Sequence, residues 1–513
     1  MIARCRRWIP VCPVLLALSA CAGHAIDDSE PAPQWQIASA GASAQTPLAE
    51  PTRCGERLAA QGLAMAPPKP SASCGVAAQD ASSICDGIRC PVSRAFEFSC
   101  TGGGYGPSVV PSGGHSSVTL FVTNAATFEA HLFSVDAQGA RAEDVQAPLN
   151  AVNLLASDPC GRVSVFAGEA PGIQLISAEA PAKWRRQEVV PVSHPAMAML
   201  ADARTGADSL ASAAYYQLDD NLPRLAAREN SVWSTRVLAN TRVSSMGLDV
   251  DDQGDTWVAW LRDGEAGLPT LELAAPDGSI HPVASGVSPE LASFWRKPVV
   301  LSGGITGQSA YPALAAVLAD GVHLWTTDAT SSIWTDRVLS ATERSADARG
   351  GGDCEFGDSP ADPCNGKTSC TRLWNETSGR LGLVRTKSGR AFAAWIQTTA
   401  EVNYALTPSV NTHGATCETR IAASRGSAEV VVAALAEGPN DAPNLTRLRF
   451  DVGGPSDGGG LSLAVRGDSL LLAASLGGAG KDAKLSYLEL DSTLLASGDT
   501  SNAGARDPHS DGQ

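Results

Sequence analysis

The sequence contains few basic residues. Its 513 residues include 38 Lys and Arg against 54 Asp and Glu, which gives a formal net charge of −16. Beyond the arginines near the amino end there is no run of basic residues. Because binding to a phosphate backbone depends on clustered Lys and Arg, this composition argues against nucleic acid as a partner. The length and a hydrophobic content of 43% instead predict a folded chain with a sizeable core.

Motifs that carry known chemistry are also lacking. The eight histidines are scattered, and there is neither a His-Glu-x-x-His metal motif nor a Gly-x-Ser-x-Gly nucleophile turn. The glycine clusters near Gly102 and Gly458 lie in polar loops and give no phosphate-cradling loop. We therefore expect no cofactor and no metal. The sequence leaves open whether the protein is an enzyme and favours one that is not.

No hydrophobic run is long enough to span a membrane. The stretch from Trp8 to Ala20 is shorter than the ~20 residues of a spanning helix, and it contains Pro10 and Pro13. A basic head, a short apolar stretch and small residues are typical of a processed export signal. The run Leu18-Ser19-Ala20-Cys21 that closes this stretch resembles the lipobox of bacterial lipoproteins.

This resemblance implies how the amino end is processed and held. Residues 1–20 would be removed as a signal peptide, and the Cys21 thiol would carry the lipid, with palmitate among its acyl chains. Two or more chains hold firmly, because each buried CH2 contributes ~0.8 kcal/mol. The residue after the cysteine is Ala22 and not an acidic residue, which resembles the pattern of lipoproteins sorted to the bacterial outer membrane. The resemblance leaves open whether the protein lies on the periplasmic face or at the cell surface. The alternative is an ordinary secretory signal, which would leave Cys21 as a spare thiol.

Thirteen cysteines point to an oxidising compartment. Ten remain once residues 1–20 are removed and Cys21 is lipidated. They fall into two even groups, each of which we expect to pair internally as disulfides: Cys54, Cys74, Cys85, Cys90, Cys100 and Cys160, then Cys354, Cys364, Cys370 and Cys417. The spacing leaves the connectivity open. It also lacks the two-residue gap of common zinc sites, so disulfides are favoured over a metal site.

Composition divides the mature chain into four segments. Residues 21–52 are rich in Ala, Pro, Ser, Asp and Gln, which predicts a flexible tether. Residues 53–105 hold five cysteines and stretches rich in Pro or Gly, which predict a disulfide-stapled cap. The body spans residues 106–497, and the polar residues 498–513 predict a disordered tail.

The body is dominated by period-two alternation of apolar residues, interrupted by turns that contain glycine. This pattern is typical of two antiparallel strands, and glycine suits such turns because hairpins require positive φ. It occurs five times, at Leu154–Phe166, Leu248–Trp260, Leu314–Trp325, Gly382–Trp395 and Leu461–Leu476. Each of these segments predicts a β-hairpin.

A second repeat follows the hairpins. The sequence SVWSTRVL at Ser231–Leu238 is echoed by SIWTDRVL at Ser332–Leu339, and a weaker copy contains Trp184. The segment Ser293–Trp295 is a further candidate that is out of phase. These spacings indicate a unit of about 50 residues, which is typical of β-propeller blades.

We therefore expect an all-β fold that is β-propeller-like, with six or seven blades and a disulfide-rich amino-terminal segment. Each blade has an apolar face that only a neighbouring blade can cover, so the blades must close in a ring. Two tandem β-sandwiches are the alternative. Residues 196–218 fit poorly, because their alanine content favours a helix.

The turn at Val250–Trp257 resembles the Asp-box of sialidases and related propellers. Asp252, Gly254, Thr256 and Trp257 match that pattern, whereas Val250 stands where Ser or Thr is usual. In that family the motif marks a structural turn, so the resemblance implies architecture and no activity. The tryptophans at repeated strand positions likewise favour packing between blades over ligand stacking: Trp233, Trp257, Trp260, Trp325, Trp334 and Trp395.

We expect a lipid-anchored cell-envelope protein whose propeller is a non-catalytic binding scaffold for a protein or a glycan. The alternative is an extracellular glycoside hydrolase, a sialidase-like propeller acting on polysaccharide or glycoconjugate. Glycoside hydrolysis needs two carboxylates at a defined separation, and with 54 acidic residues many pairs can be proposed. A carboxylate pair or an arginine cluster in the central channel would favour the hydrolase.

Overall fold

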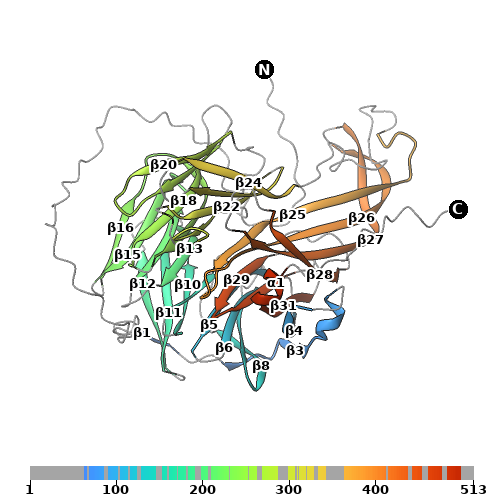
Figure 1. Cartoon of the computed structure of the whole chain (residues 1–513). Coiled ribbons are helices and arrows are strands. Elements are labelled where there is room, and N and C mark those ends of the chain that lie inside the picture. Colours follow the sequence, from blue (N-terminus) through green and yellow to red (C-terminus); the bar gives the residue numbers. More distant parts are fainter. Residues whose placement is uncertain are drawn as a thin grey trace, which may run out of the picture. The chain divides into compact units, whose positions relative to one another are not determined.

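The computed structural model describes the chain between residues 63 and 497 (Figure 1). Short stretches between strands are not described, nor are the longer ones at 146–152, 191–197, 287–297, 342–362 and 453–459. The described residues are almost entirely strands, arranged in seven antiparallel sheets. No described helix is both long and apolar enough to cross a membrane.

Three of the sheets contain five strands. The β5 sheet consists of β5 (Gly104–Ser112), β6 (Ser116–Thr123), β7 (Glu129–Asp136), β8 (Gly139–Val145) and β2 (Lys69–Pro70). The β9 sheet consists of β9 (Asn153–Ser157), β10 (Val163–Glu169), β11 (Gly172–Ala180), β12 (Lys183–Val190) and β1 (Leu63–Met65). The β29 sheet consists of β29 (Leu461–Arg466), β30 (Ser469–Ser475), β31 (Asp482–Asp491), β4 (Val92–Thr101) and β3 (Cys74–Ala78).

The other four sheets have four strands each. The β13 sheet consists of β13 (Ala198–Thr205), β14 (Ala211–Gln217), β15 (Pro223–Glu229) and β16 (Val232–Val237). The β17 sheet consists of β17 (Val243–Val250), β18 (Thr256–Arg262), β19 (Thr270–Ala274) and β20 (Ile280–Ser285). The β21 sheet consists of β21 (Val299–Leu301), β22 (Ala313–Leu318), β23 (Gly321–Thr327) and β24 (Trp334–Ala341). The β25 sheet consists of β25 (Ser369–Arg385), β26 (Ala391–Asn411), β27 (Gly414–Leu435) and β28 (Asn444–Val452).

The first strands of these sheets form a closed cycle of contacts. Each of β5, β9, β13, β17, β21, β25 and β29 contacts the next, and β29 contacts β5. The ring is closed within the β29 sheet, where β4 from the amino-terminal part pairs with β31 from the carboxyl-terminal part. The fold is a β-propeller, which confirms the predicted fold class and excludes two tandem sandwiches.

The hydrophobic core lies between neighbouring sheets. Seven clusters of buried residues each combine side chains of two adjacent sheets. Trp260, Trp325 and Trp395 are fully buried in these clusters, as expected for packing between blades. Each sheet therefore depends on its neighbours to cover its apolar faces.

The five predicted hairpins are present, as β9–β10, β17–β18, β22–β23, β25–β26 and β29–β30. Gly254 adopts φ 90° in the β17–β18 turn, where a residue with a side chain would be strained. The second repeat marks the fourth strand of a sheet, because Trp184, Trp233 and Trp334 lie on β12, β16 and β24.

The helix favoured at residues 196–218 is wrong. Residues 198–205 and 211–217 form β13 and β14, and Ala203, Ala213 and Ala214 are fully buried there. Alanine serves here as a small side chain that lets neighbouring sheets approach closely. Packing between sheets therefore overrides its helix propensity.

The described part of the predicted cap contributes strands to the sheets. We call residues 63–85 the belt. Its strands β1, β2 and β3 pair antiparallel with the outer strands β12, β8 and β4. It then reaches the β25 sheet, where Cys85 forms a bridge with Leu448 and the Arg449 N–H donates to the Ile84 carbonyl at 3.1 Å.

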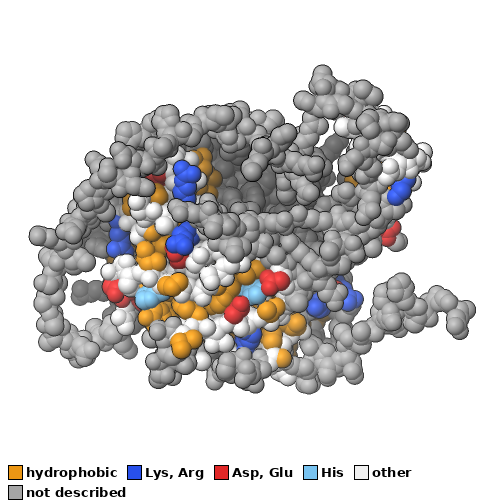
Figure 2. All heavy atoms as spheres, turned by 90° about the horizontal axis from the view of Figure 1, so that it is seen from above, with side chains coloured by type: hydrophobic (Ala, Val, Ile, Leu, Met, Phe, Trp, Pro, Cys, Tyr) orange, Lys and Arg blue, Asp and Glu red, His pale blue; other side chains and the backbone are white. Residues whose placement is uncertain are grey.

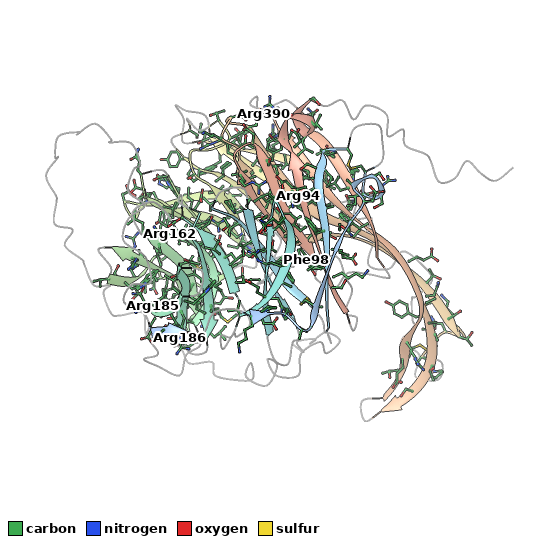
Figure 3. All side chains as sticks on the ribbon, turned by 90° about the horizontal axis from the view of Figure 1, so that it is seen from below. Arg94, Phe98, Arg162, Arg185, Arg186 and Arg390 are labelled. Carbon is green, nitrogen blue, oxygen red and sulfur yellow. A yellow bond between two sulfur atoms is a disulfide. The ribbon has the colours of Figure 1, made fainter. Side chains whose placement is uncertain are left out.

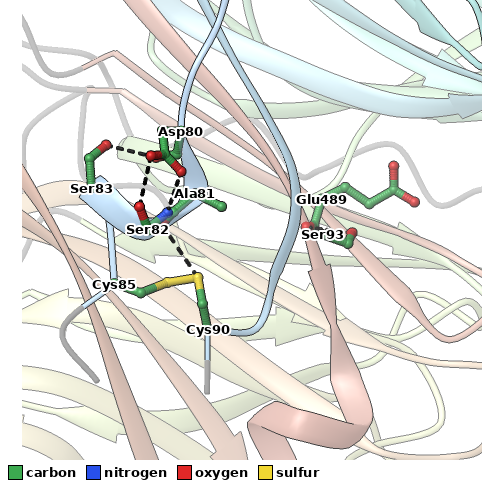
Figure 4. Close-up of a disulfide and its surroundings, with 8 residues drawn as sticks. All are labelled: Asp80, Ala81, Ser82, Ser83, Cys85, Cys90, Ser93 and Glu489. Atoms are coloured by element: carbon green, nitrogen blue, oxygen red, sulfur yellow. Dashed lines mark hydrogen bonds between the residues drawn. A yellow bond between two sulfur atoms is a disulfide. The ribbon is translucent and has the colours of Figure 1, made fainter. Parts of the chain in front are cut away.

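A short turn of helix, η1 (Ala81–Ser83), ends the belt (Figure 4). The Asp80 carboxylate accepts hydrogen bonds from the Ser82 N–H at 3.0 Å and the Ser82 hydroxyl at 2.8 Å. The disulfide Cys85–Cys90 follows, just before β4. At the other end of the chain, α1 (Ser492–Ala496) follows β31 and buries Leu495 in the core between the β25 and β29 sheets.

The β25 sheet extends beyond the propeller core. Its strands β25, β26 and β27 have 17, 21 and 22 residues, and Figure 1 shows them as long orange ribbons. The outer part of this sheet holds Cys370, Leu406 and Cys417. Together with Cys364, which precedes β25, it forms a small buried cluster that carries the Cys364–Cys417 disulfide. We call this part the arm.

Candidate functional site

Two carboxylates on inner strands hold the backbone of the next sheet. Asp202 on β13 accepts a hydrogen bond from the N–H of Leu248 on β17 at 3.1 Å. Asp249 on β17 accepts one from the N–H of Ser302, just after β21, at 2.8 Å. These are charge-assisted bonds, and they tie three consecutive sheets together near the ring axis.

Two serines perform the same task elsewhere in the ring. The hydroxyl of Ser462 on β29 accepts from the N–H of Val109 on β5 at 3.0 Å. The hydroxyl of Ser108 on β5 accepts from the N–H of Leu155 on β9, also at 3.0 Å. The inner strands thus carry a recurring side-chain tie whose function is structural.

Arg204 lies between the two acids. Its Nη1 is 3.1 Å from Asp202 Oδ1, and its Nε is 3.7 Å from Asp249 Oδ1. Burial raises the pKa of Asp249, and the Arg204 guanidinium opposes that rise. Burial would lower the pKa of Arg204, but the two carboxylates outweigh it and raise the pKa. The three groups form one ion-paired network, in which both carboxylates are paired with Arg204.

Two further arginines near the ends of inner strands are also bonded to the protein. Arg385 Nη1 donates to the carbonyls of Gly303 at 3.3 Å and Gly304 at 2.8 Å. Arg466 pairs with Glu489. Among the described residues, Arg204, Arg385 and Arg466, at or next to the ends of β13, β25 and β29, are thus bonded to different internal partners. This arrangement does not provide a cluster for binding one substrate carboxylate.

Three tyrosines that a sialidase-like mechanism could have used are buried. Burial raises the pKa of Tyr216 to about 12 and also raises the pKa of Tyr215 and Tyr487. The Tyr487 hydroxyl also lies 2.6 Å from the Ser117 hydroxyl. A protonated, buried phenol is a poor nucleophile, so these groups do not support catalysis.

A half-buried aromatic cluster lies between the β17 and β21 sheets. The ring of Tyr311 meets those of Trp257, His281 and Trp334 at centroid distances of 6.1, 5.1 and 6.1 Å, each in an edge-to-face arrangement. Trp257 and His281 begin the second and fourth strands of one sheet, while Tyr311 and Trp334 precede or begin those of the next. Antiparallel order therefore places all four at the face where the inner strands end.

Polar groups border the aromatic cluster. The Trp257 indole N–H donates to Asp251 Oδ2 at 3.4 Å. His281 Nε2 is 3.0 Å from the Ser279 hydroxyl, which donates to Asp277 at 2.6 Å. The Ser279 hydroxyl and N–H lower the pKa of Asp277, so this exposed carboxylate is ionised at neutral pH. Figure 2 shows a similar mixture on one face, with hydrophobic side chains among acidic, basic and histidine ones.

The tryptophan at the equivalent repeat position has different surroundings. Trp233 on β16 packs edge-to-face on Phe166 at 6.3 Å, against the apolar core between the β9 and β13 sheets. Trp334 instead joins a cluster with polar groups at its border. Both tryptophans are half-buried and pack against a core between sheets, and they differ in that Trp334 also contacts Tyr311 in the aromatic cluster.

The predicted Asp-box turn is organised by Asp251. Its Oδ1 accepts from the N–H groups of Gln253 and Asp255, both at 2.9 Å. Asp252, the acid that matches the motif, lies outside the described residues. The turn is structural, as the resemblance implied, and the preceding acid performs the capping.

The structure describes three disulfides: Cys74–Cys100, Cys85–Cys90 and Cys364–Cys417. Each joins cysteines of the same predicted group, and Cys370 is disulfide-bonded as well. The remaining predicted residues lie outside the described part of the chain, namely Cys21, Cys54, Cys160 and Cys354. The same holds for the repeat candidate at 293–295.

One group of side chains has the spacing of a metal site. Ligand atoms of Cys74, Cys100 and His131 lie within 4.8 Å of one another. The two sulfurs form a disulfide, however, so neither is a thiolate that could bind a metal. His131 is bonded to Asp144 instead, with Nδ1 2.7 Å from Oδ1.

A second pair of residues repeats this histidine arrangement. His131-Leu132-Phe133 on β7 and His323-Leu324-Trp325 on β23 occupy the third strand of their sheets. His323 Nδ1 lies 2.9 Å from Asp336, which follows it by 13 residues, as Asp144 follows His131. The sequence analysis did not predict these pairs of a buried histidine and a more exposed aspartate, although the shared His-Leu-aromatic triplet could have revealed them.

No family model matches this chain, and no curated protein matches its sequence. Several solved structures are similar to it at low identity. A puromycin-hydrolyzing peptidase of Mycobacterium tuberculosis is 11% identical with a TM-score of 0.40, and the match covers 76% of this chain but only 51% of that one. The WD40 domain of SCAP from fission yeast is 10% identical with a TM-score of 0.33, over 75% of this chain and 91% of that one.

A sialidase of Trypanosoma rangeli is also similar, at 10% identity and a TM-score of 0.35, over 75% of this chain and 58% of that one. These likenesses concern the fold alone. The chain is a β-propeller by its own sheet order and ring of contacts. We therefore infer its function from the contacts of its own residues.

Proposed function

We propose that this protein is a non-catalytic binding scaffold for a protein or a glycan. One observation carries the proposal: the carboxylates of Asp202 and Asp249, on inner strands β13 and β17, are committed to backbone N–H groups of the next sheet. A glycosidase needs one carboxyl group to donate a proton and another to act as base or nucleophile. Asp202 and Asp249 instead hold sheets together and share Arg204.

The aromatic cluster of Trp257, His281, Tyr311 and Trp334 is the contact surface that we propose for a glycan. Ring faces stack on sugar rings, and bordering carboxylates accept hydrogen bonds from hydroxyl groups. Immobilised protein on a glycan microarray tests this proposal. Binding that Trp334→Ala abolishes and Trp233→Ala retains would support it, once circular dichroism shows that both variants fold. Equal loss in the two variants would assign both tryptophans to packing.

We further propose that Cys21 anchors the protein in the bacterial outer membrane through its lipid. The lipobox-like run Leu18–Cys21 and the basic residues before it support this proposal. Metabolic palmitate labelling of cells expressing the wild type and Cys21→Ala tests it. Label in the wild type alone is expected, whereas equal labelling would rule out Cys21 as the attachment site.

A further inference from the structure

The belt leaves three consecutive sheets of the ring without an added strand. It lies on the outer strands of the β9, β5 and β29 sheets and bridges to the β25 sheet. Among the described residues, β16, β20 and β24 are outer edges with neither a further strand nor a bridge, whereas β28 has the Cys85 bridge alone. Such edges are ready templates for an additional strand.

Exposed apolar side chains gather at these same edges. Seven large hydrophobic residues are exposed among the described residues, and five of them lie on or next to these edges: Val232, Val237, Ile280, Ile333 and Val338. On β16, Val232 and Val237 are 67% and 51% exposed. Buried area would be gained if an extended segment covered them.

The backbone of β16 offers free groups on its outer side. Leu238 donates its N–H inward to the carbonyl of Pro223 at 2.8 Å. Since inward and outward groups alternate along an antiparallel pair, the N–H and carbonyl groups of Trp233, Thr235 and Val237 point away from β15. These outward positions span five residues of β16, which is longer than the three-residue pairing of β1 on β12.

The surroundings of β16 are basic on an otherwise acidic protein. Arg236 on β16 and Arg242 in the following turn are exposed. Arg185 and Arg186, labelled in Figure 3, lie on β12, which contacts β16. At the equivalent edge of β24, Asp336 replaces Thr235, so that edge carries an acid where β16 has none.

We propose that the β16 edge binds an extended acidic segment of a partner protein as a fifth, antiparallel strand. This inference rests on the proposed binding function and specifies a protein partner. Main-chain bonds to the outward groups would supply affinity, and the arginines would select acidic side chains. The bound strand would occupy on the β13 sheet the place that belt strand β1 occupies on the neighbouring β9 sheet.

Fluorescence anisotropy with a labelled peptide, acetyl-(Glu-Thr-Glu-Val)3-amide, tests the proposal on the folded full-length protein. We expect saturable binding that raised salt weakens. The same peptide with Lys in place of Glu should bind at least ~10-fold more weakly because of the arginines. N-methylation of alternate backbone nitrogens should abolish binding, because it removes the donors of a paired strand.

The sequence repeat provides matched variants. Arg236→Glu should weaken binding by ~10-fold, whereas Arg337→Glu at the equivalent position of β24 should change it by less than ~2-fold. Val237→Pro removes an outward N–H that the fold does not use, so it should weaken binding while leaving the unfolding temperature unchanged. Arg236→Gln serves as a milder variant if Arg236→Glu folds poorly.

Equal binding of the Glu and Lys peptides, or equal effects of Arg236→Glu and Arg337→Glu, would overturn the proposal. So would an absence of saturable peptide binding. If glycans still bind in that case, the proposed binding function stands and only the strand-addition site fails. Turnover of a glycan would instead contradict the proposed function itself.

Discussion

The carboxylate of Asp202 accepts a hydrogen bond from the backbone N–H of Leu248 on the adjacent sheet, at 3.1 Å. Asp202 is only 2% exposed, and its carboxylate holds two sheets together. Asp249 repeats the arrangement one sheet further along the ring. A carboxylate bonded to the backbone of the next sheet in this way has a structural role.

Replacing Asp202 should destabilise the propeller. Asp202→Ala leaves the buried Leu248 N–H without its partner, so we expect the free energy of unfolding to fall by about 2–3 kcal/mol. Urea unfolding followed by tryptophan fluorescence measures this change. Asp219→Ala, at an exposed position near the β14–β15 turn, is the control and should stay within about 0.5 kcal/mol of the wild type. Equal stability of the two variants would contradict the structural role.

Close approach of two inner strands requires Gly247. A Cβ atom added there would lie 1.9 Å from the carbonyl oxygen of Pro298, just before β21. Gly247→Ala should therefore force the sheets apart and cost about 1–3 kcal/mol or more. Gly75→Ala is the matched control, because its Cβ would meet nothing nearer than 4.0 Å. Differential scanning calorimetry should show a lower unfolding temperature for Gly247→Ala alone.

The disulfide Cys74–Cys100 fastens the belt to β4. Replacing both cysteines with alanine should reduce the free energy of unfolding by about 2–4 kcal/mol, since the crosslink constrains the unfolded chain. The Cys364–Cys417 pair lies in the arm. Its removal should expose the arm to proteolysis while the unfolding midpoint of the propeller changes little. A large shift of that midpoint would show that the arm stabilises the core.

Asp249 should make stability depend on pH in mildly acidic solution. Burial raises the pKa of Asp249 in the folded protein, so the folded state binds its proton more tightly than the unfolded state. Stability contributed by that proton is lost as the pH rises from the unfolded pKa through the folded one. Asp249→Asn should flatten this part of the curve in unfolding experiments at stepwise pH. An unchanged slope would mean that Arg204 fully cancels the effect of burial.

Local sequence patterns were sufficient for the hairpins because each depends on neighbouring residues. The turn with Gly254 and the alternation around Trp260 predict β17–β18 directly. The repeat around Trp233 and Trp334 likewise marked equivalent outer strands. These features require no knowledge of distant contacts.

Long-range features could not be predicted in the same way. β4 pairs with β31 almost 400 residues away along the chain, and alternation within Phe96–Cys100 does not name that partner. The belt strand Leu63–Met65 has only three residues, too few for an alternating pattern, and its pairing with β12 is likewise long-range. Asp202 lies within an alanine-rich segment, where its tie to Leu248 depends on how two sheets meet.

Turnover measured on bound glycans distinguishes a binding scaffold from a hydrolase. The wild type, Asp202→Asn and Asp249→Asn are incubated with array-selected glycans, and released sugar is quantified by mass spectrometry. We predict binding without release in all three. Release by the wild type that is lost in a folded, ligand-binding Asn variant would show that these carboxylates act in catalysis.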